Sequence, residues 1–216
     1  RTKAAADYAA AGKNFPGGLN GFLRQLALIE REKRADYAAI LAPQELEDLE
    51  MRETMAGQTV HRLLGETAAS DEQRRAVFRL QLAFEDRFAL TFDLKPGALL
   101  ERESVRREAN ESIRTKLGDA LFLEWLRGDG ADFTAMAELA ARQGLPVESR
   151  VELWRVKNDF HLARLKINSA GATPTVQFRA AHAALVQQTE LRLIGILGAG
   201  TVQLERTGVF AWLGKP

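Results

Sequence analysis

The sequence predicts an all-α protein of about seven to nine helices, arranged as two tandem helical-hairpin units. Three observations favour this fold class. Apolar residues recur at three- and four-residue spacing along most of the chain, alternating runs of β-branched residues are missing, and Ala, Leu, Glu, Arg and Gln dominate the sequence. This pattern is typical of packed amphipathic helices and argues against a sheet.

A repeated phrase suggests that the fold is duplicated. Val77-Phe78-Arg79-Leu80, followed by Phe84, matches Leu153-Trp154-Arg155-Val156, followed by Phe160, at an offset of 76 residues (153 − 77). Identity over the surrounding stretch is no higher than chance, so the interpretation depends on matching apolar positions and helix breaks. Two unrelated helical hairpins could share these features, and duplication therefore remains a hypothesis.

The breaks divide the chain into four expected parts, which could also form one continuous domain. They are a frayed N-terminal segment (1–18), a first helical unit (19–94), a second helical unit (95–170), and a C-terminal helix with its cap (171–216).

Helix starts in the first unit follow from prolines and one capping motif. A helix is expected over 19–40, and Pro43 then begins another that continues to Leu64 with an interruption near Gly57. Ser70 and Gln73 have the spacing of a capping box, which predicts the start of a helix that reaches Phe88.

The second unit follows the same order. Its expected helices cover 98–117, 119–126, 132–143 and 146–167. Thr173 and Pro174 then cap a last long helix, which ends at Gly198. The glycines at 195, 198 and 200 follow a helix rather than a strand, so they indicate a helix stop and not a phosphate-binding loop.

Composition excludes several classes of function. The net charge is +1, with acidic and basic residues mixed, which argues against a nucleic-acid surface and a basic membrane patch. The absence of cysteine excludes disulfides, zinc–thiolate sites and thiol nucleophiles. The weakly polar stretch 193–202 is too short to cross a bilayer. Because the chain opens on Arg1, we expect a processed or truncated product, which a signal peptide or membrane anchor could precede.

Three segments carry a resemblance to known proteins: LAPQELEDLEMR (41–52), RAVFRLQLAFE (75–85) and KLG (116–118). They resemble a group of uncharacterised bacterial helical proteins of the verrucomicrobial type, which implies an exported or membrane-anchored protein of unknown activity. The 41–52 segment is also loosely similar to periplasmic stress proteins of the Spy and CpxP type, which act as holdases or metal sensors. This chain differs from them in length and in having few histidines, which speaks against metal sensing.

No motif for catalysis is present. None of the serines lies in a Gly-x-Ser-x-Gly or Ser-x-x-Lys motif, so no nucleophilic triad, no enzyme activity and no cofactor are expected.

Metal ligands have one weak set of candidates. Glu85 and Asp86 fall opposite His161 and Leu162 in the repeat, so Glu85, Asp86 and His161 could share a metal if the two units pair face to face. The simpler interpretation is a polar rim beside Phe84 and its counterpart.

Partner binding has four candidates at matching positions of the two units. Arg79 and Arg155 lie next to Phe78 and Trp154, and each arginine could stack on rings or hold a carboxylate at the junction between the units. The alternative is that the rings are core and the arginine stems cover apolar surface.

We therefore expect a non-enzymatic, exported helical protein in the periplasm or cell envelope. It is expected to bind other polypeptides or itself, in a chaperone-like, scaffold or envelope-stress role, and not to bind nucleic acid. The alternatives left open are a metal or small-ligand sensor and an enzyme with an unrecognised site.

Overall fold

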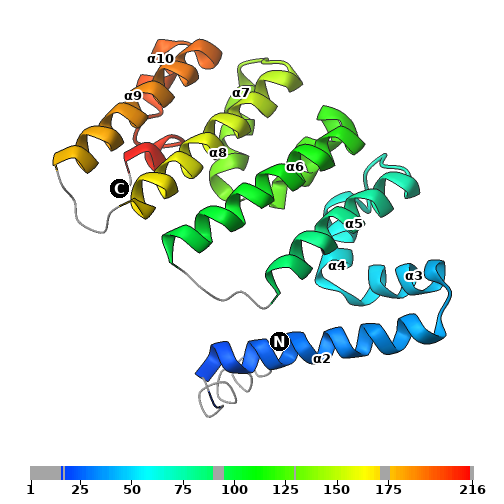
Figure 1. Ribbon diagram of the computed structural model, residues 1–216. Helices are drawn as coiled ribbons and strands as arrows, with labels where there is room; N and C mark the ends of the chain where they lie inside the picture. Colours follow the sequence, from blue (N-terminus) through cyan, green and yellow to red (C-terminus); the bar gives the residue numbers. More distant parts are fainter. Residues whose placement is uncertain (1–15, 17, 90–94, 129, 171–175, 215–216) are drawn as a thin grey trace, which may run out of the picture. The chain divides into compact units, whose positions relative to one another are not determined.

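The computed structural model describes residues 16, 18–89, 95–128, 130–170 and 176–214 (Figure 1). Within these ranges the regular structure is entirely helical and contains no strand, which confirms the predicted all-α class. The α-helices are α2 (Gly18–Ile40), α3 (Pro43–Glu53), α4 (Met55–Leu64), α5 (Asp71–Phe88), α6 (Pro96–Trp125), α7 (Ala131–Arg142), α8 (Val147–Ser169), α9 (Val176–Leu197) and α10 (Ala199–Leu204), and the 3-10 helices are η1 (Leu126–Gly128) and η2 (Ala211–Gly214).

The predicted helix starts are confirmed where the structure describes them. The backbone N–H of Gln73 donates to Ser70 Oγ (3.1 Å), and the backbone N–H of Ser70 donates to Gln73 Oε1 (2.9 Å), which is a complete capping box. Pro43 and Pro96 occupy the first turns of α3 and α6. Thr173, Pro174 and most of the expected frayed segment lie outside the described residues.

The interruption expected near Gly57 lies at Thr54 instead. Thr54 has an extended backbone (φ −83°, ψ 159°), and its hydroxyl donates to the carbonyl of Glu50 (2.7 Å) while accepting from the N–H of Gly57 (3.1 Å). The threonine side chain therefore ends α3 and caps α4. Gly57 has a different role, because a Cβ there would lie 2.0 Å from the carbonyl oxygen of Met51.

Two glycines with positive φ break the long helices. Gly118 (φ 73°, ψ 166°) kinks α6 into two helical segments, and Gly198 (φ 82°) separates α9 from α10. Each follows a buried leucine, Leu117 or Leu197. Positive φ strains residues with a Cβ, so glycine is the residue suited to both breaks. The stop expected at Gly198 is confirmed.

The chain forms two compact units, which are described separately. Unit 1 contains Arg1–Thr59 and Phe78–Asp93, and unit 2 contains Val60–Val77 and Leu94–Pro216. Neither unit is contiguous in sequence, whereas the expected units were, and the tandem duplication stays a prediction. In unit 2, α8 lies between α6 and α9 and also packs on α7 (Figure 1).

Aromatic and aliphatic side chains fill the core of unit 2. Trp154 is fully buried and meets Phe122 edge to face, with ring centroids 5.2 Å apart. Ile113, Phe133 and Met136 are also inaccessible to solvent or nearly so. In unit 1, Phe84 and Phe88 are buried with their centroids 5.3 Å apart. Among the described helices, none has the length and apolarity needed to span a membrane.

Candidate functional site

A polar cavity of about 330 Å³ lies in unit 2, between side chains from α6, α7, α8 and η2. Helix α8 supplies Lys157, His161 and Arg164, whose i, i+4, i+7 spacing places them on one face. His161, one of the candidates from the sequence, thus lines a cavity within its own unit.

The apolar part of the lining is aromatic. Phe160 and Trp212 are 2% and 6% exposed, and their rings meet edge to face with centroids 5.1 Å apart. His182 of α9 also lies against Phe160, with its ring centroid 6.3 Å from that of the phenylalanine. Trp212 therefore ties the C-terminal 3-10 helix to α8 at the cavity.

The charged part of the lining is more basic than acidic. Arg106, Lys157 and Arg164 face the cavity together with Glu103 and Asp132. The acids pair loosely with two of the cations: Arg106 Nη1 lies 3.6 Å from Glu103 Oε1, and Lys157 Nζ lies 3.9 Å from Asp132 Oδ2. With a neutral histidine, the lining has one excess positive charge.

His161 is held neutral and oriented within this lining. Burial lowers the pKa of His161, against the attraction of Glu103 and with the help of nearby Arg164. Arg164 Nη2 lies 3.4 Å from His161 Nδ1, and a guanidinium can only donate. In this arrangement Nδ1 accepts, and the ring proton of the neutral form is on Nε2.

Trp212 has an unsatisfied donor. Its indole Nε1 is buried, and no described residue provides a hydrogen-bond acceptor for it. Leaving a buried donor unpaired costs about 1–3 kcal/mol, so such groups are few in folded proteins and call for an explanation.

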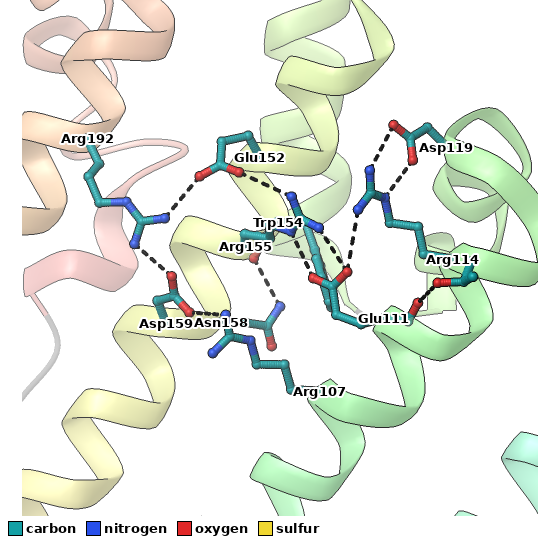
Figure 2. A network of polar contacts seen from close by, with 11 residues as sticks. Arg107, Glu111, Arg114, Asp119, Glu152, Trp154, Arg155, Asn158, Asp159 and Arg192 are labelled. Carbon is teal, nitrogen blue, oxygen red and sulfur yellow. Dashed lines mark hydrogen bonds and ion pairs between the residues drawn. The ribbon is translucent and has the colours of Figure 1, made fainter.

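An ion-pair ladder fixes the helices that carry the cavity (Figure 2). Acidic and basic residues alternate along it, and the path runs from α6 across α8 to Arg192 of α9 and then back through α8 to α6. The order is Asp119, Arg114, Glu111, Arg155, Glu152, Arg192, Asp159 and Arg107. The closest contacts across helices are Arg107 Nη2 to Asp159 Oδ1 (2.6 Å) and Arg192 Nη1 to Asp159 Oδ2 (2.7 Å). The ladder joins α8 to both of its neighbours.

The four candidates for partner binding fall into two kinds of environment. Arg155 binds Glu111 through two hydrogen bonds, and Arg79 binds Glu47 in the same way (2.8 and 3.0 Å). Each arginine therefore holds a carboxylate of its own unit. Phe78 and Trp154 are 1% and 0% exposed, so their rings belong to the core.

Glu85 and Asp86 belong to unit 1, where they line a second cavity of about 320 Å³. Arg34 Nη1 donates to both oxygens of Asp86 (2.6 and 2.8 Å), and Gln81 Nε2 donates to Glu85 Oε1 (2.9 Å). Burial raises the pKa of Glu85. Across the described part of the chain, no three His, Asp or Glu side chains form a group that could hold a metal ion. The site shared with His161 stays a prediction without geometric support.

The outer face of α9 was not predicted from the sequence. Every exposed residue in the range 180–200 is uncharged. The exposed residues are Ala180, Ala181, Ala183, Ala184, Gln187, Gln188, Leu191, Ile194, Gly195, Gly198, Ala199 and Gly200. The sequence does contain a signal for this uncharged face, because the range 180–200 has only three ionisable residues, His182, Glu190 and Arg192.

The charged residues in the range 180–200, Glu190 and Arg192, form ion pairs within unit 2. Arg206 Nη1 lies 3.0 Å from Glu190 Oε1, and Arg192 binds Glu152 and Asp159 of α8. The opposite side of the helix buries Leu193 and Leu197. An uncharged outer side opposite a buried apolar side favours a helix that is covered on both sides.

Comparisons of the chain with models of protein families, with curated proteins and with solved structures gave no significant match.

Proposed function

We propose that the protein is a non-enzymatic helical protein that binds another polypeptide through the outer face of α9. The observation that carries the proposal is the absence of charge from every exposed position in the range 180–200. In a chain with 27% charged residues, a solvent-facing side of a helix would ordinarily carry several of them.

Covering this face with a partner costs little desolvation free energy. Removing a charged side chain from water costs several kcal/mol, and no such group lies on the face. Leu191 is 63% exposed and Ile194 is 36% exposed, so both have apolar area left to bury. Burial contributes about 25 cal/mol per Å² of apolar surface.

The shape of the face favours a helical partner. Ala180, Ala184 and Gly195 are small, which allows the backbone of a second helix to approach closely, and Gln187 and Gln188 can form hydrogen bonds at the centre. An amphipathic helix laid along α9 is the matching partner. A chaperone-like, scaffold or envelope-stress role in the cell envelope belongs to this class, and the resemblance of the 41–52 segment to periplasmic stress proteins supports it.

Photo-cross-linking tests the proposal and identifies the partner in the same step. We would replace Gln188 by p-benzoylphenylalanine in cells that produce the protein, and identify adducts by mass spectrometry. The same probe at Ala141, an exposed position on α7, is the control. We expect a defined polypeptide adduct, to a partner or to a second copy, from position 188 alone.

The purified partner should then bind this protein only when the outer face of α9 is intact. Leu191→Glu should weaken it at least about tenfold in calorimetry, because a carboxylate would be desolvated. Met55→Glu, at a 68% exposed apolar position of unit 1, should leave binding unchanged. Adducts identical to those of the control, or equal binding by Leu191→Glu, would contradict the proposal.

A further inference from the structure

We propose that the cavity of unit 1 binds a small organic cation, an ammonium group on an apolar skeleton, with the ammonium beside Glu85. This site is separate from the outer face of α9, and the proposal does not depend on polypeptide binding there. The cavity has a volume of about 320 Å³, at the lower end of the usual range for ligand sites, which suits a single-ring compound. The proposal rests on the charge of the lining, the contacts of Glu85 and an accessible apolar wall.

The lining of this cavity is more acidic than basic. Its carboxylates are Glu30, Glu50, Glu53, Glu85 and Asp86, and its cations are Lys33 and Arg34. Both cations are already paired within the lining. Arg34 lies 2.7 Å from Glu50 and 2.6 Å from Asp86, and Lys33 lies 3.2 Å from Glu53. Because five acids face two cations, the ionised lining repels an anion and attracts a cation.

Glu85 is the carboxylate of this lining that has only neutral hydrogen-bond partners among the described residues. Gln81 Nε2 donates to its Oε1 (2.9 Å), and the backbone N–H of Ala56 donates to the same carboxylate. An ionised carboxylate has about four lone-pair sites, so two donors leave capacity for a ligand. Burial, with a contribution from Asp86, raises the pKa of Glu85. A bound ammonium group would supply the counter-charge that this side chain lacks.

The rest of the lining offers an apolar wall that a ligand can reach. Met55 is 68% exposed, and Tyr37, Leu49 and Leu82 are half-buried at the cavity. Covering such surface favours a ligand with a ring or an alkyl chain. A bare metal ion fits less well, because the described residues contain no group of three His, Asp or Glu side chains that could hold one. The lining therefore matches a cation that carries apolar surface.

Two sources share this chemistry, an aromatic amine and an aliphatic amine. Calorimetric titration of the whole chain with phenethylammonium, and separately with hexylammonium, distinguishes them. The matched comparisons are 2-phenylethanol, which has the ring without the charge, and methylammonium, which has the charge without the apolar group. Each titration is made at two temperatures, because burial of apolar surface gives a heat of binding that changes with temperature.

We expect at least one of the two apolar amines to bind at least about tenfold more tightly than 2-phenylethanol and than methylammonium. Tighter binding of phenethylammonium would assign the site to aromatic amines, and tighter binding of hexylammonium to aliphatic ones. No heat from either amine at millimolar concentration, at both temperatures, would overturn the proposal. Equal binding of 2-phenylethanol or of methylammonium would also overturn it.

Substitutions place the binding in this cavity. Glu85→Gln removes the charge and keeps the size of the side chain, and it should weaken amine binding at least about tenfold. Glu66→Gln, at an exposed position of unit 2, removes the same charge and should leave the affinity unchanged. Met55→Ala shortens the apolar wall and should weaken binding about threefold.

Circular dichroism checks that each variant is folded. Unchanged affinity in a folded Glu85→Gln variant would refute the assignment. If Glu85→Gln does not fold, unchanged affinity in Met55→Ala would refute it instead.

Discussion

Arg155 of α8 and Glu111 of α6 form a two-point ion pair, with Nε 2.8 Å from Oε1 and Nη2 2.9 Å from Oε2. The pair lies in the middle of the ladder that also holds Arg192 of α9 (Figure 2). The same ladder therefore positions α8, which lines the cavity, and α9, which presents the uncharged face. The proposed binding face of α9 depends on this arrangement of helices.

Breaking the pair should destabilise unit 2. Arg155→Lys keeps the charge but loses the planar two-point geometry, and we expect it to lower the free energy of unfolding by about 1 kcal/mol. Urea denaturation measures this change. Arg155→Lys combined with Glu111→Gln should cost less than the sum of the single changes, and strict additivity would show that the pair contributes nothing.

The same pair gives a pH dependence. The hydrogen bonds from Arg155 hold the pKa of Glu111 below its ordinary value, and Arg114 does the same for the pKa of Asp119. A lowered folded pKa stabilises the protein above the unfolded pKa, and this stability is lost as pH falls through the folded value. We expect melting temperature to fall on acidification below about pH 4.5. The melting temperature of the Glu111→Gln variant should fall less steeply with pH than that of the wild type. An equal slope for the two proteins would contradict this assignment.

The contribution of Glu85 to stability should depend on pH in the opposite direction. Burial raises its pKa in the folded state, so the ionised form opposes folding and acidification through the folded pKa relieves this effect. Glu85→Gln retains an acceptor for Gln81 and removes the charge. Its free energy of unfolding at pH 7 should equal or exceed that of the wild type in denaturant titrations. A clear loss would show that the carboxylate has a favourable role, such as binding an ion.

Substitution of Trp154 tests whether its ring belongs to the core or to a partner-binding surface. Because the ring is fully buried against Phe122, Trp154→Ala should lower the free energy of unfolding by about 3–5 kcal/mol. Trp154→Phe keeps most of the ring and should cost less. Calorimetric melting distinguishes the variants. A negligible change in Trp154→Ala would show that the side chain is not part of the core.

Two glycines give a matched pair of backbone predictions. Gly118→Ala places a Cβ at φ 73° and should cost about 1–2 kcal/mol, although nothing lies within 4 Å of that Cβ. Gly195 lies within α9 and also has open space, so Gly195→Ala should stabilise the helix by about 0.4–1 kcal/mol. Thermal melting of both variants checks this. If both substitutions changed the stability in the same direction, the assigned backbone conformations would be contradicted.

Local signals in the sequence predict the fold class and many helix boundaries. The capping box at Ser70 and the glycine stop at Gly198 act within a few residues, and both are present in the structure. The break predicted near Gly57 is misplaced, because glycine is only one of the residues that can interrupt a helix. In the structure the hydroxyl of Thr54 ends one helix and starts the next, and Gly57 allows close approach to Met51.

Long-range pairing cannot be predicted in this way. The i, i+4 spacing of Glu103 and Arg107 would allow a pair along α6, but Arg107 binds Asp159 of α8 and Glu103 pairs with Arg106. The partner of a surface arginine depends on which helix packs beside it, and periodicity does not contain that information. For the same reason, the sequence indicates His161 as a candidate without the cavity around it.

Cysteine labelling tests the proposed role of α9 most directly, since these 216 residues contain no cysteine. A single Gln188→Cys variant would be reacted with a maleimide in cells that produce the protein and after purification, with Ala141→Cys as the control. We expect position 188 to react at least about tenfold more slowly in cells, Leu191→Glu to restore its reactivity, and position 141 to react equally in both. Equal reactivity of position 188 in cells and in the purified protein would show that the face is not covered, and would contradict the proposed function.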